Sequence, residues 1–356
     1  MSETISSPPI FDGHNDVLTR LWQKSPEQAH KFFLEGDGEG HLDLPRIKQG
    51  GMCGGFFAMW IPSDEPLNQN HESMQGDHYD LPLPPPVPQG DALNIAMAQA
   101  AILLRIERES AGQVKICRNA AEVQHCISNN QLAAILHLEG AEPIDKDFTA
   151  LKVLHAAGLR FLGPVWSRPN RYGHGVPFRY PSSPNIGPGL TDDGKRLVRA
   201  CNELNIVIDL AHLNEKSFRV VAALSDTPLV ATHSNAHANC PVARNLTDWQ
   251  LSAIRESNGM VGVNFATCFL RADGQMLAET PLQDILHHID YLIEKLGEDR
   301  VGFGSDFDGA VVPDAIGSVA GLPNLRQAMS MHGYDEALQK KICYENWIAL
   351  LSRTVR

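Results

Sequence analysis

The most informative absences in this 356-residue sequence concern cysteine pairs, long apolar runs and positive charge. Its seven cysteines are scattered without a CxxC pair, which indicates buried free thiols and no disulfide framework. No apolar run approaches the ~20 residues that a membrane-spanning helix needs. Acidic residues outnumber basic ones by 42 to 30, for a formal net charge of −12. This charge argues against nucleic acid or an anionic membrane surface as a partner.

The first residues, MSETISSPPIFDG, lack the basic start and the apolar segment that together make a secretory signal. The last residues, WIALLSRTVR, are too short and too charged for a lipid-anchor tail. The odd number of cysteines, without a disulfide pattern, favours a reducing compartment. We therefore expect a cytoplasmic protein with no membrane partner.

Eight short apolar runs are the strand candidates, and most of them lack the alternation of a half-exposed strand. They are residues 9–16, 52–61, 132–139, 159–166, 206–212, 228–234, 259–266 and 300–306. Helical patterns lie between them, for example at 91–109, 148–157, 191–204 and 281–296, and two more follow near 322–330 and 334–352. Strands that alternate with helices pair in parallel through right-handed crossovers.

This order predicts an α/β fold, a (β/α)8 TIM barrel with a C-terminal helical extension, formed by residues 1–356 as a single domain. The alternative, a doubly wound open sheet, lacks support because no GxGxxG follows the first strand. Two irregular stretches, 62–89 and 167–190, are rich in proline. Each follows a predicted strand, so both are expected to cover the active-site face of the barrel.

Residues that can bind metals occur where five of the predicted strands end, and the strand ends of a barrel converge on one mouth. They are His14 and Asp16, His137 and Glu139, Asp209 and His212, His233, and Asp306 with Asp308. A lone histidine in a strand is more often a core residue than a ligand. Several carboxylates and histidines in one buried mouth, however, are hard to satisfy without cations.

Five of these residues exceed the needs of one open zinc site, which usually takes three protein ligands, and instead suit two metals that share a carboxylate. We expect His14 and Asp16 to hold one metal, His212 and His233 the other, and Glu139 to bridge them. Imidazole and carboxylate suit Zn²⁺, and Mn²⁺, Co²⁺ and Fe²⁺ accept the same ligands. Asp306 remains free to act as general base and acid.

The other histidines are not predicted to be metal ligands. His137 lies one layer deeper than Glu139, which favours a core residue or a support for a ligand over a ligand itself. His155, His287 and His288 fall in helical patterns and are expected at the surface. A phosphate-binding loop at GFGSDFDG is disfavoured because its two aspartates would repel a phosphate.

The candidate site residues lie in sequence motifs. Six motifs occur in this order along the chain: DGHND, HLEG, VIDLAH, THSNA, ARNLTD and GFGSDFDG. Together they resemble the membrane (renal) dipeptidase family, peptidase family M19, of the metal-dependent amidohydrolase barrels. The resemblance runs from about residue 10 to the C-terminal helices. It implies a binuclear zinc dipeptidase with two Zn²⁺ per subunit and the five ligands above, in a bacterial-type soluble member. It also implies that Arg244 binds the C-terminal carboxylate of the substrate. Members of this family are commonly dimers, which makes a homodimer a candidate assembly, although the sequence itself does not give the oligomeric state.

Two positions depart from the animal members of that family. Trp166 stands where they carry a substrate-contacting histidine, and its indole N–H can donate only one hydrogen bond. The oxyanion would then depend more on the metal, or on Arg168 or another loop donor. Ala266 stands where animal members carry a tyrosine near the substrate. Both changes bear on substrate preference.

The expected activity is hydrolysis of the peptide bond of dipeptides, L-Xaa-L-Xaa or L-Xaa-D-Xaa, by a metal-bridging hydroxide with Asp306 as proton shuttle. The same metals could open other bonds, so a hydrolase of N-acyl amino acids, lactones or β-lactams is the alternative enzyme. An inactive metal-binding barrel is the alternative from a different class.

Overall fold

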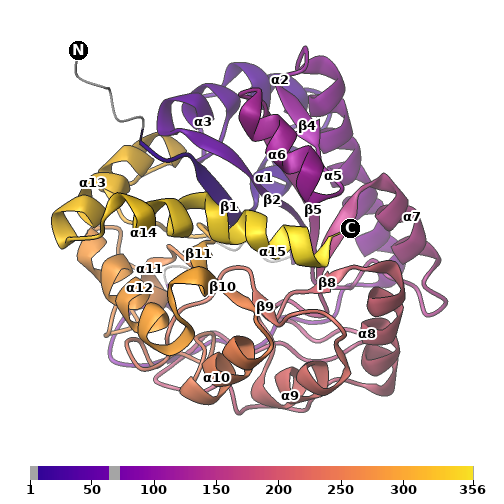
Figure 1. The fold of residues 1–356 in the computed structure, drawn as a ribbon. Coiled ribbons are helices and arrows are strands. Elements are labelled where there is room, and N and C mark those ends of the chain that lie inside the picture. Colours follow the sequence, from indigo (N-terminus) through magenta and orange to yellow (C-terminus); the bar gives the residue numbers. More distant parts are fainter. Residues whose placement is uncertain (1–6, 64–72, 356) are drawn as a thin grey trace, which may run out of the picture.

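The computed structural model describes residues 7–63 and 73–355, and its centre is a barrel of eight parallel strands surrounded by helices (Figure 1). The strands are β1 (Ile10–Asn15), β2 (Met52–Trp60), β5 (Leu132–Glu139), β6 (Leu159–Gly163), β8 (Val207–Ile208), β9 (Val230–Ala231), β10 (Met260–Val263) and β11 (Val301–Phe303). They are hydrogen-bonded in the order β8-β6-β5-β2-β1-β11-β10-β9. A parallel bridge between Asp209 and Val230 joins the two ends of this order. The predicted (β/α)8 barrel is confirmed.

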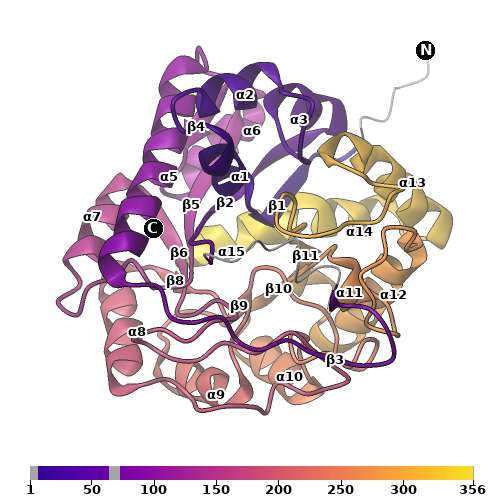
Figure 2. The same ribbon diagram turned by 180° about the vertical axis from the view of Figure 1, so that it is seen from behind.

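Helices cover the outside of the barrel, as the alternating sequence pattern predicts (Figures 1 and 2). They are α1 (Val17–Lys24), α2 (Ala29–Glu35), α3 (Leu44–Gly50), α5 (Gln89–Glu109), α6 (Ala120–Ser128), α7 (Thr149–Ala157), α8 (Asp192–Leu204), α9 (Glu215–Leu224), α10 (Asp248–Glu256), α11 (Thr267–Leu270), α12 (Leu282–Leu296), α13 (Leu322–His332), α14 (Glu336–Lys340) and α15 (Asn346–Thr354). The last three form the predicted C-terminal extension. Among the described residues, none of the helices combines the length and the apolar character needed to cross a membrane.

The C-terminal extension packs against the end of the barrel away from the predicted site. The Trp347 side chain of α15 is fully buried and its indole N–H donates to the Phe303 carbonyl at 2.9 Å. Its ring lies 5.1 Å from that of Phe56, which stacks on Phe161 in the barrel interior. A Cβ at Gly302 would lie 2.6 Å from Trp347 Nε1, so the tryptophan fits only because this strand residue is glycine.

Seven of the eight predicted strands extend beyond the observed ones, most of all those at 206–212 and 228–234, and three observed strands were not predicted. The ladders end at Ile208 and Ala231, short of the predicted ends at residues 212 and 234. The reason is Asp209, whose carboxylate accepts the backbone N–H groups of Ala211 and Thr232 in place of strand partners. One of the unpredicted strands, β4 (Val114–Ile116), pairs with β5 outside the ring.

The two proline-rich stretches meet on the other face of the barrel (Figure 2). Part of the first, residues 64–72, lies outside the described residues. Beyond it, β3 (Tyr79–Asp80) pairs antiparallel with β7 (Arg179–Tyr180) of the second stretch. Both stretches also contribute to the pocket described below, at the carboxyl ends of the strands, as expected.

Candidate metal centre and active site

The side chains predicted to hold metals lie together at the carboxyl ends of the barrel strands. His14 lies on β1 and Glu139 ends β5, whereas the others follow the ends of their strands. All five side chains are buried: His14, Asp16, Glu139, His212 and His233. Residues more than a hundred positions apart in the sequence thus become neighbours because parallel strands end at one face of a barrel.

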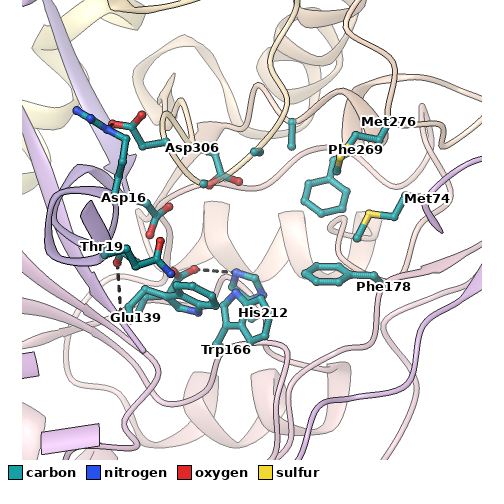
Figure 3. Close-up of a pocket in the computed structure, with 17 residues that line it drawn as sticks. Asp16, Thr19, Met74, Glu139, Trp166, Phe178, His212, Phe269, Met276 and Asp306 are labelled. Atoms are coloured by element: carbon teal, nitrogen blue, oxygen red, sulfur yellow. Dashed lines mark hydrogen bonds and ion pairs between the residues drawn. The ribbon is translucent and has the colours of Figure 1, made fainter. Parts of the chain in front are cut away.

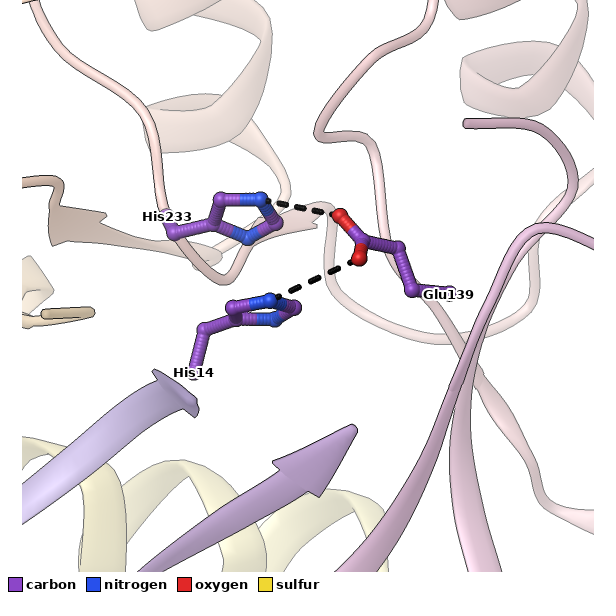
Figure 4. Close-up of side chains that lie close together, drawn as sticks. All are labelled: His14, Glu139 and His233. Atoms are coloured by element: carbon purple, nitrogen blue, oxygen red, sulfur yellow. Dashed lines mark ion pairs between the residues drawn. The ribbon is translucent and has the colours of Figure 1, made fainter. Parts of the chain in front are cut away.

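The carboxylate of Glu139 lies between two groups of ligand atoms. Its Oε1 atom is 2.9 Å from His212 Nε2 and 3.3 Å from His233 Nε2. Its Oε2 atom is 3.6 Å from His14 Nε2, which in turn is 3.1 Å from Asp16 Oδ2. Figure 4 shows His14 and His233 facing the two different oxygens of this carboxylate. The two oxygens of Glu139 are therefore each available to a different group of histidine nitrogens.

The electrostatics of the cluster also suit cations. Burial, followed by the charge of Asp16, raises the pKa of Glu139 well above its ordinary value. Burial raises the pKa of Asp16 to about 7, with a further contribution from Asp308. Burial lowers the pKa of His212 and His233 well below the ordinary value, which keeps both imidazoles neutral. Neutral imidazoles and carboxylates that need positive charge are the donor set of a divalent metal.

Buried polar atoms without a hydrogen-bond partner also indicate that the cluster can bind metal ions. Among the described residues, His14 Nδ1 and Asp16 Oδ1 are buried without a hydrogen-bond partner. The side chains form two sets, and within each set the possible ligand atoms all lie within 4.8 Å of one another. The first set is His14, Glu139 and His233, and the second is His14, Asp16 and Asp306. The residues present therefore fit metal ions, and the second set places Asp306 within reach of one.

A second layer of side chains orients the histidines. Ser167 Oγ lies 2.8 Å from His212 Nδ1, and Thr232 Oγ1 lies 2.9 Å from His233 Nδ1. The Thr232 hydroxyl also donates to Asp209 Oδ2 at 2.6 Å. Such partners fix the tautomer and the direction of a ligand imidazole. Sequence reasoning missed Ser167 and Thr232, since nothing in their local pattern distinguishes them from other loop residues.

His137 lies behind this layer. Its side chain is fully buried, its Nε2 is 3.3 Å from Asp209 Oδ2, and its ring packs edge-on against His14. The structure therefore places His137 beneath the proposed ligands, as the sequence suggested, and adds the Asp209 carboxylate as its neighbour.

Asp306 is held at the edge of the cluster by the backbone of β1 and by an amide side chain. Its N–H donates to the His14 carbonyl at 3.0 Å, and its Oδ2 accepts from Asn264 Nδ2 at 2.8 Å. The residue adopts a left-handed φ of 60°. Burial raises the pKa of its carboxyl group. Gly309 leaves room for this group, because a Cβ there would lie 2.5 Å from Asp306 Oδ1.

Arg244 lies next to the same cluster. Its side chain is buried, donates to Ser234 Oγ at 2.8 Å and to the His233 carbonyl at 2.9 Å, and its charge acts on Asp306 and Glu139. Its Nε is buried and has no hydrogen-bond partner among the described residues.

A pocket of about 720 Å³, its open mouth included, leads to the cluster (Figure 3). Glu139, His212, Asp16 and Asp306 line its floor, and Trp166 and Ala266 line it as well. The remaining lining residues are Thr19, Arg20, Gln23, Trp60, Met74, Phe178, Phe269, Met276, Asp308, Gly309 and Ala310. Most of the apolar ones are aromatic or methionine side chains, as in a pocket for a small organic molecule.

Arg168 requires a correction. Its side chain is fully buried. Its guanidinium pairs with Glu142 at 3.0 Å and donates to the Ile61 carbonyl at 2.8 Å and to Ser63 Oγ at 3.0 Å. These bonds direct its donors away from the cluster, so we assign Arg168 a structural role in place of the predicted contact with the substrate.

His288 requires a second correction, because it is fully buried and not at the surface. Its Nδ1 accepts the Ala236 N–H at 3.1 Å and its Nε2 lies 2.9 Å from the Leu270 carbonyl oxygen. Asp308 lies in the turn after β11 with a left-handed φ of 67°, and its Oδ1 accepts the His41 N–H at 2.5 Å.

Comparison with known proteins shows the family of this chain. Residues 1–355 match the family model of the membrane dipeptidases, peptidase family M19. A crystal structure of a metallopeptidase from Rhodobacter sphaeroides, liganded with a phosphinate mimic of the dipeptide L-Ala-D-Ala, is similar at 55% identity and a TM-score of 0.96, over 98% of this chain and 100% of that one.

Two further relatives are known from sequence. An uncharacterised Klebsiella pneumoniae protein is 48% identical over 74% of this chain and 97% of its own, and an Aspergillus terreus dipeptidase is 27% identical over 97% of this chain and 84% of its own. The chain belongs to the membrane dipeptidase family, peptidase family M19, and is a metallodipeptidase.

Proposed function

We propose that this protein hydrolyses dipeptides, L-Xaa-L-Xaa and/or L-Xaa-D-Xaa, as a binuclear zinc enzyme. The observation that carries the proposal is the position of Glu139, whose Oε1 faces His212 and His233 and whose Oε2 faces His14. His14 and Asp16 would hold one ion, and His212 and His233 the other. Imidazole and carboxylate together suit Zn²⁺. When bound, the two ions supply Lewis acidity, which activates water and polarises the scissile carbonyl.

Asp306 is the residue proposed to move the proton. Its carboxyl group lies at the pocket floor, and Asn264 holds one of its oxygens at 2.8 Å. Its raised pKa brings the group closer to neutral pH, where it can both accept and release a proton. In this role it accepts the proton of the attacking water and delivers it to the leaving amine.

Arg244 is proposed to bind the C-terminal carboxylate of the substrate. A guanidinium pairs with a carboxylate through two parallel hydrogen bonds, and the buried Nε without a partner supplies one free donor. This anchor would select peptides whose carboxylate lies one residue beyond the scissile bond. Trp166 lines the pocket 5.9 Å from the His212 ring, ring centre to ring centre, and is proposed to contact the substrate there.

Hydrolysis of N-acyl amino acids or β-lactams remains the alternative activity, since the same metals could open those bonds. An inactive metal-binding barrel is the other alternative. The dipeptide mimic bound by the Rhodobacter sphaeroides relative supports the dipeptidase. The decisive assay uses zinc-loaded protein with paired L-Xaa-L-Xaa and L-Xaa-D-Xaa dipeptides, N-acyl amino acids and a β-lactam. Turnover of N-acyl amino acids without any free dipeptide would contradict the proposal, and bound metal without any turnover would indicate the inactive barrel.

The family match over residues 1–355 supports the proposal that the chain forms a single catalytic domain. The homodimer and the cytoplasmic location stay predictions. Light scattering during size-exclusion chromatography measures the first, and cell fractionation the second.

A further inference from the structure

One side of the pocket is apolar and comes from three separate loops. Figure 3 shows Met74, Phe178, Phe269 and Met276 together, across the pocket from Asp16 and Thr19. We call these four side chains the apolar wall. The wall contains no charged or hydrogen-bonding side chain, whereas the rest of the pocket carries carboxylates, an arginine and a glutamine.

Contacts between the loops hold the apolar wall in place. The Met276 N–H donates to the Met74 carbonyl at 2.8 Å, and the Phe178 and Phe269 rings stack with their centres 6.1 Å apart. Met74, Phe269 and Met276 are only 2%, 6% and 7% exposed. A wall that is already packed loses little conformational freedom when a ligand side chain covers it.

The apolar wall lies between the two ends of the proposed reaction site. Phe269 is next to the proposed carboxylate anchor, because the Arg244 guanidinium carbon is 5.7 Å from its ring centre. Phe178 is next to the metal cluster, because its ring centre is 6.5 Å from that of His212. The C-terminal residue of a bound dipeptide spans this interval, from the scissile bond to the carboxylate. Ala266, which also lines the pocket, presents only a methyl group and leaves room for that residue's side chain.

We propose that the apolar wall selects the side chain of the C-terminal residue of the dipeptide, and favours aliphatic and aromatic residues over charged ones. This inference rests on the proposed dipeptidase activity and on the role of Arg244 in it. A charged side chain against the wall would lose its hydration without gaining a partner. The two methionines are flexible and polarisable, so the wall accepts both leucine and phenylalanine.

The test is a panel of L-dipeptides with the zinc-loaded enzyme. The series Ala-Leu, Ala-Phe, Ala-Asp and Ala-Lys varies the C-terminal residue, and Leu-Ala, Phe-Ala, Asp-Ala and Lys-Ala vary the other. We expect kcat/KM for Ala-Leu and Ala-Phe to exceed that for Ala-Asp and Ala-Lys by about 100-fold, a discrimination within reach of pocket contacts. The reversed series should show a smaller spread.

A variant locates the effect on the apolar wall. Met276→Ala should lower kcat/KM about 10-fold more for Ala-Leu than for Ala-Ala, because the shorter side chain removes contacts with the leucine. Met331→Ala is the control, since Met331 is 81% exposed on α13, and it should change neither value. Should Met276→Ala fail to fold, Met74→Ala tests the same wall.

The outcomes separate this inference from the proposed function. Equal kcat/KM for Ala-Leu and Ala-Asp, or a preference for apolar residues that appears only in the reversed series, would overturn the inference and leave the dipeptidase intact. Equal losses for Ala-Leu and Ala-Ala in the Met276 variant would also overturn it. No turnover of any dipeptide would overturn the proposed function and the inference together.

Discussion

The Nε2 atoms of His212 and His233 lie 3.3 Å apart, and both face Glu139 Oε1. Each ring has its other nitrogen next to a hydroxyl, from Ser167 for His212 and from Thr232 for His233. Burial keeps both imidazoles neutral, so the two Nε2 atoms can offer lone pairs in the same direction. The orientation of the two imidazole rings therefore depends on these two hydroxyl groups.

Replacing Ser167 tests that dependence. Ser167→Ala removes the hydroxyl 2.8 Å from His212 Nδ1 and should lower zinc affinity by about 10- to 100-fold, the usual cost of losing such a support. Competition with a chromogenic chelator measures the affinity. Ser352→Ala, an exposed serine on α15, is the control. Unchanged zinc affinity in Ser167→Ala would show that its hydroxyl does not orient the imidazole.

Asp306→Asn separates proton transfer from metal binding. The amide keeps the shape of the side chain but cannot accept a proton, so kcat should fall by about 10²- to 10⁴-fold. The metal content, measured by mass spectrometry, should stay that of the unmodified protein. Asp226→Asn, at an exposed position, serves as the control for both measurements. Loss of metal in proportion to activity would make Asp306 a ligand, a role that its distance from His14 and Asp16 allows.

Gly309→Ala should damage the site without replacing any of the proposed ligands. The added Cβ would lie 2.2 Å from Asp16 Oδ2 and 2.5 Å from Asp306 Oδ1, which forces one carboxylate to move. We expect at least a tenfold loss of kcat/KM, since small displacements of reacting groups cost about 10²-fold.

Gly90→Ala is the matched control for Gly309→Ala. A Cβ at Gly90 meets nothing within 4 Å, and the residue lies within α5, where alanine stabilises a helix by about 0.5–1 kcal/mol relative to glycine. Full activity in Gly309→Ala would show that the carboxylates tolerate displacement.

The buried His288 side chain should make the free energy of unfolding depend on pH. Burial lowers the pKa of His288 from 6.5 to about 4, so below pH 6.5 the unfolded chain binds a proton that the folded one does not. The contribution of His288 to the free energy of unfolding is therefore fully present above pH 6.5, and it is lost as the pH drops toward 4. The loss between pH 7 and pH 4.5 amounts to about 2–3 kcal/mol.

Urea unfolding of the wild type and of His288→Gln at these two pH values, in a chelator, measures this loss. The variant should lose about 2–3 kcal/mol less on acidification than the wild type. An equal loss in both would show that His288 does not become protonated on unfolding.

The clustering of the proposed metal ligands could be predicted because their pattern has a simple geometric meaning. His14 and Asp16 are two apart, hence on one side of the chain in an extended segment, and strand ends of a barrel meet at one mouth. The same reasoning found Glu139 as the residue between the two groups. Both inferences use only the alternation of side chains along a strand and the common position of the strand ends.

The errors arose where partners come from distant parts of the chain. Arg168 directs its donors to Glu142 and to the residues after β2, which no local pattern reveals. The helical pattern at 281–296 predicted α12, but not that His288 would receive the Ala236 N–H from a loop after β9. The predicted ends of β8 and β9 were wrong for a similar reason. Backbone N–H groups after these strands donate to the Asp209 carboxylate and not to a neighbouring strand.

The metal content of the wild type and of Glu139→Gln tests the central claim, that one carboxylate joins two metal positions. Mass spectrometry of zinc-loaded protein should find two zinc ions per chain in the wild type. In Glu139→Gln both positions lose their shared anionic ligand, so we expect fewer than one ion per chain. One zinc ion per chain in the wild type, or two retained in the variant, would contradict the account.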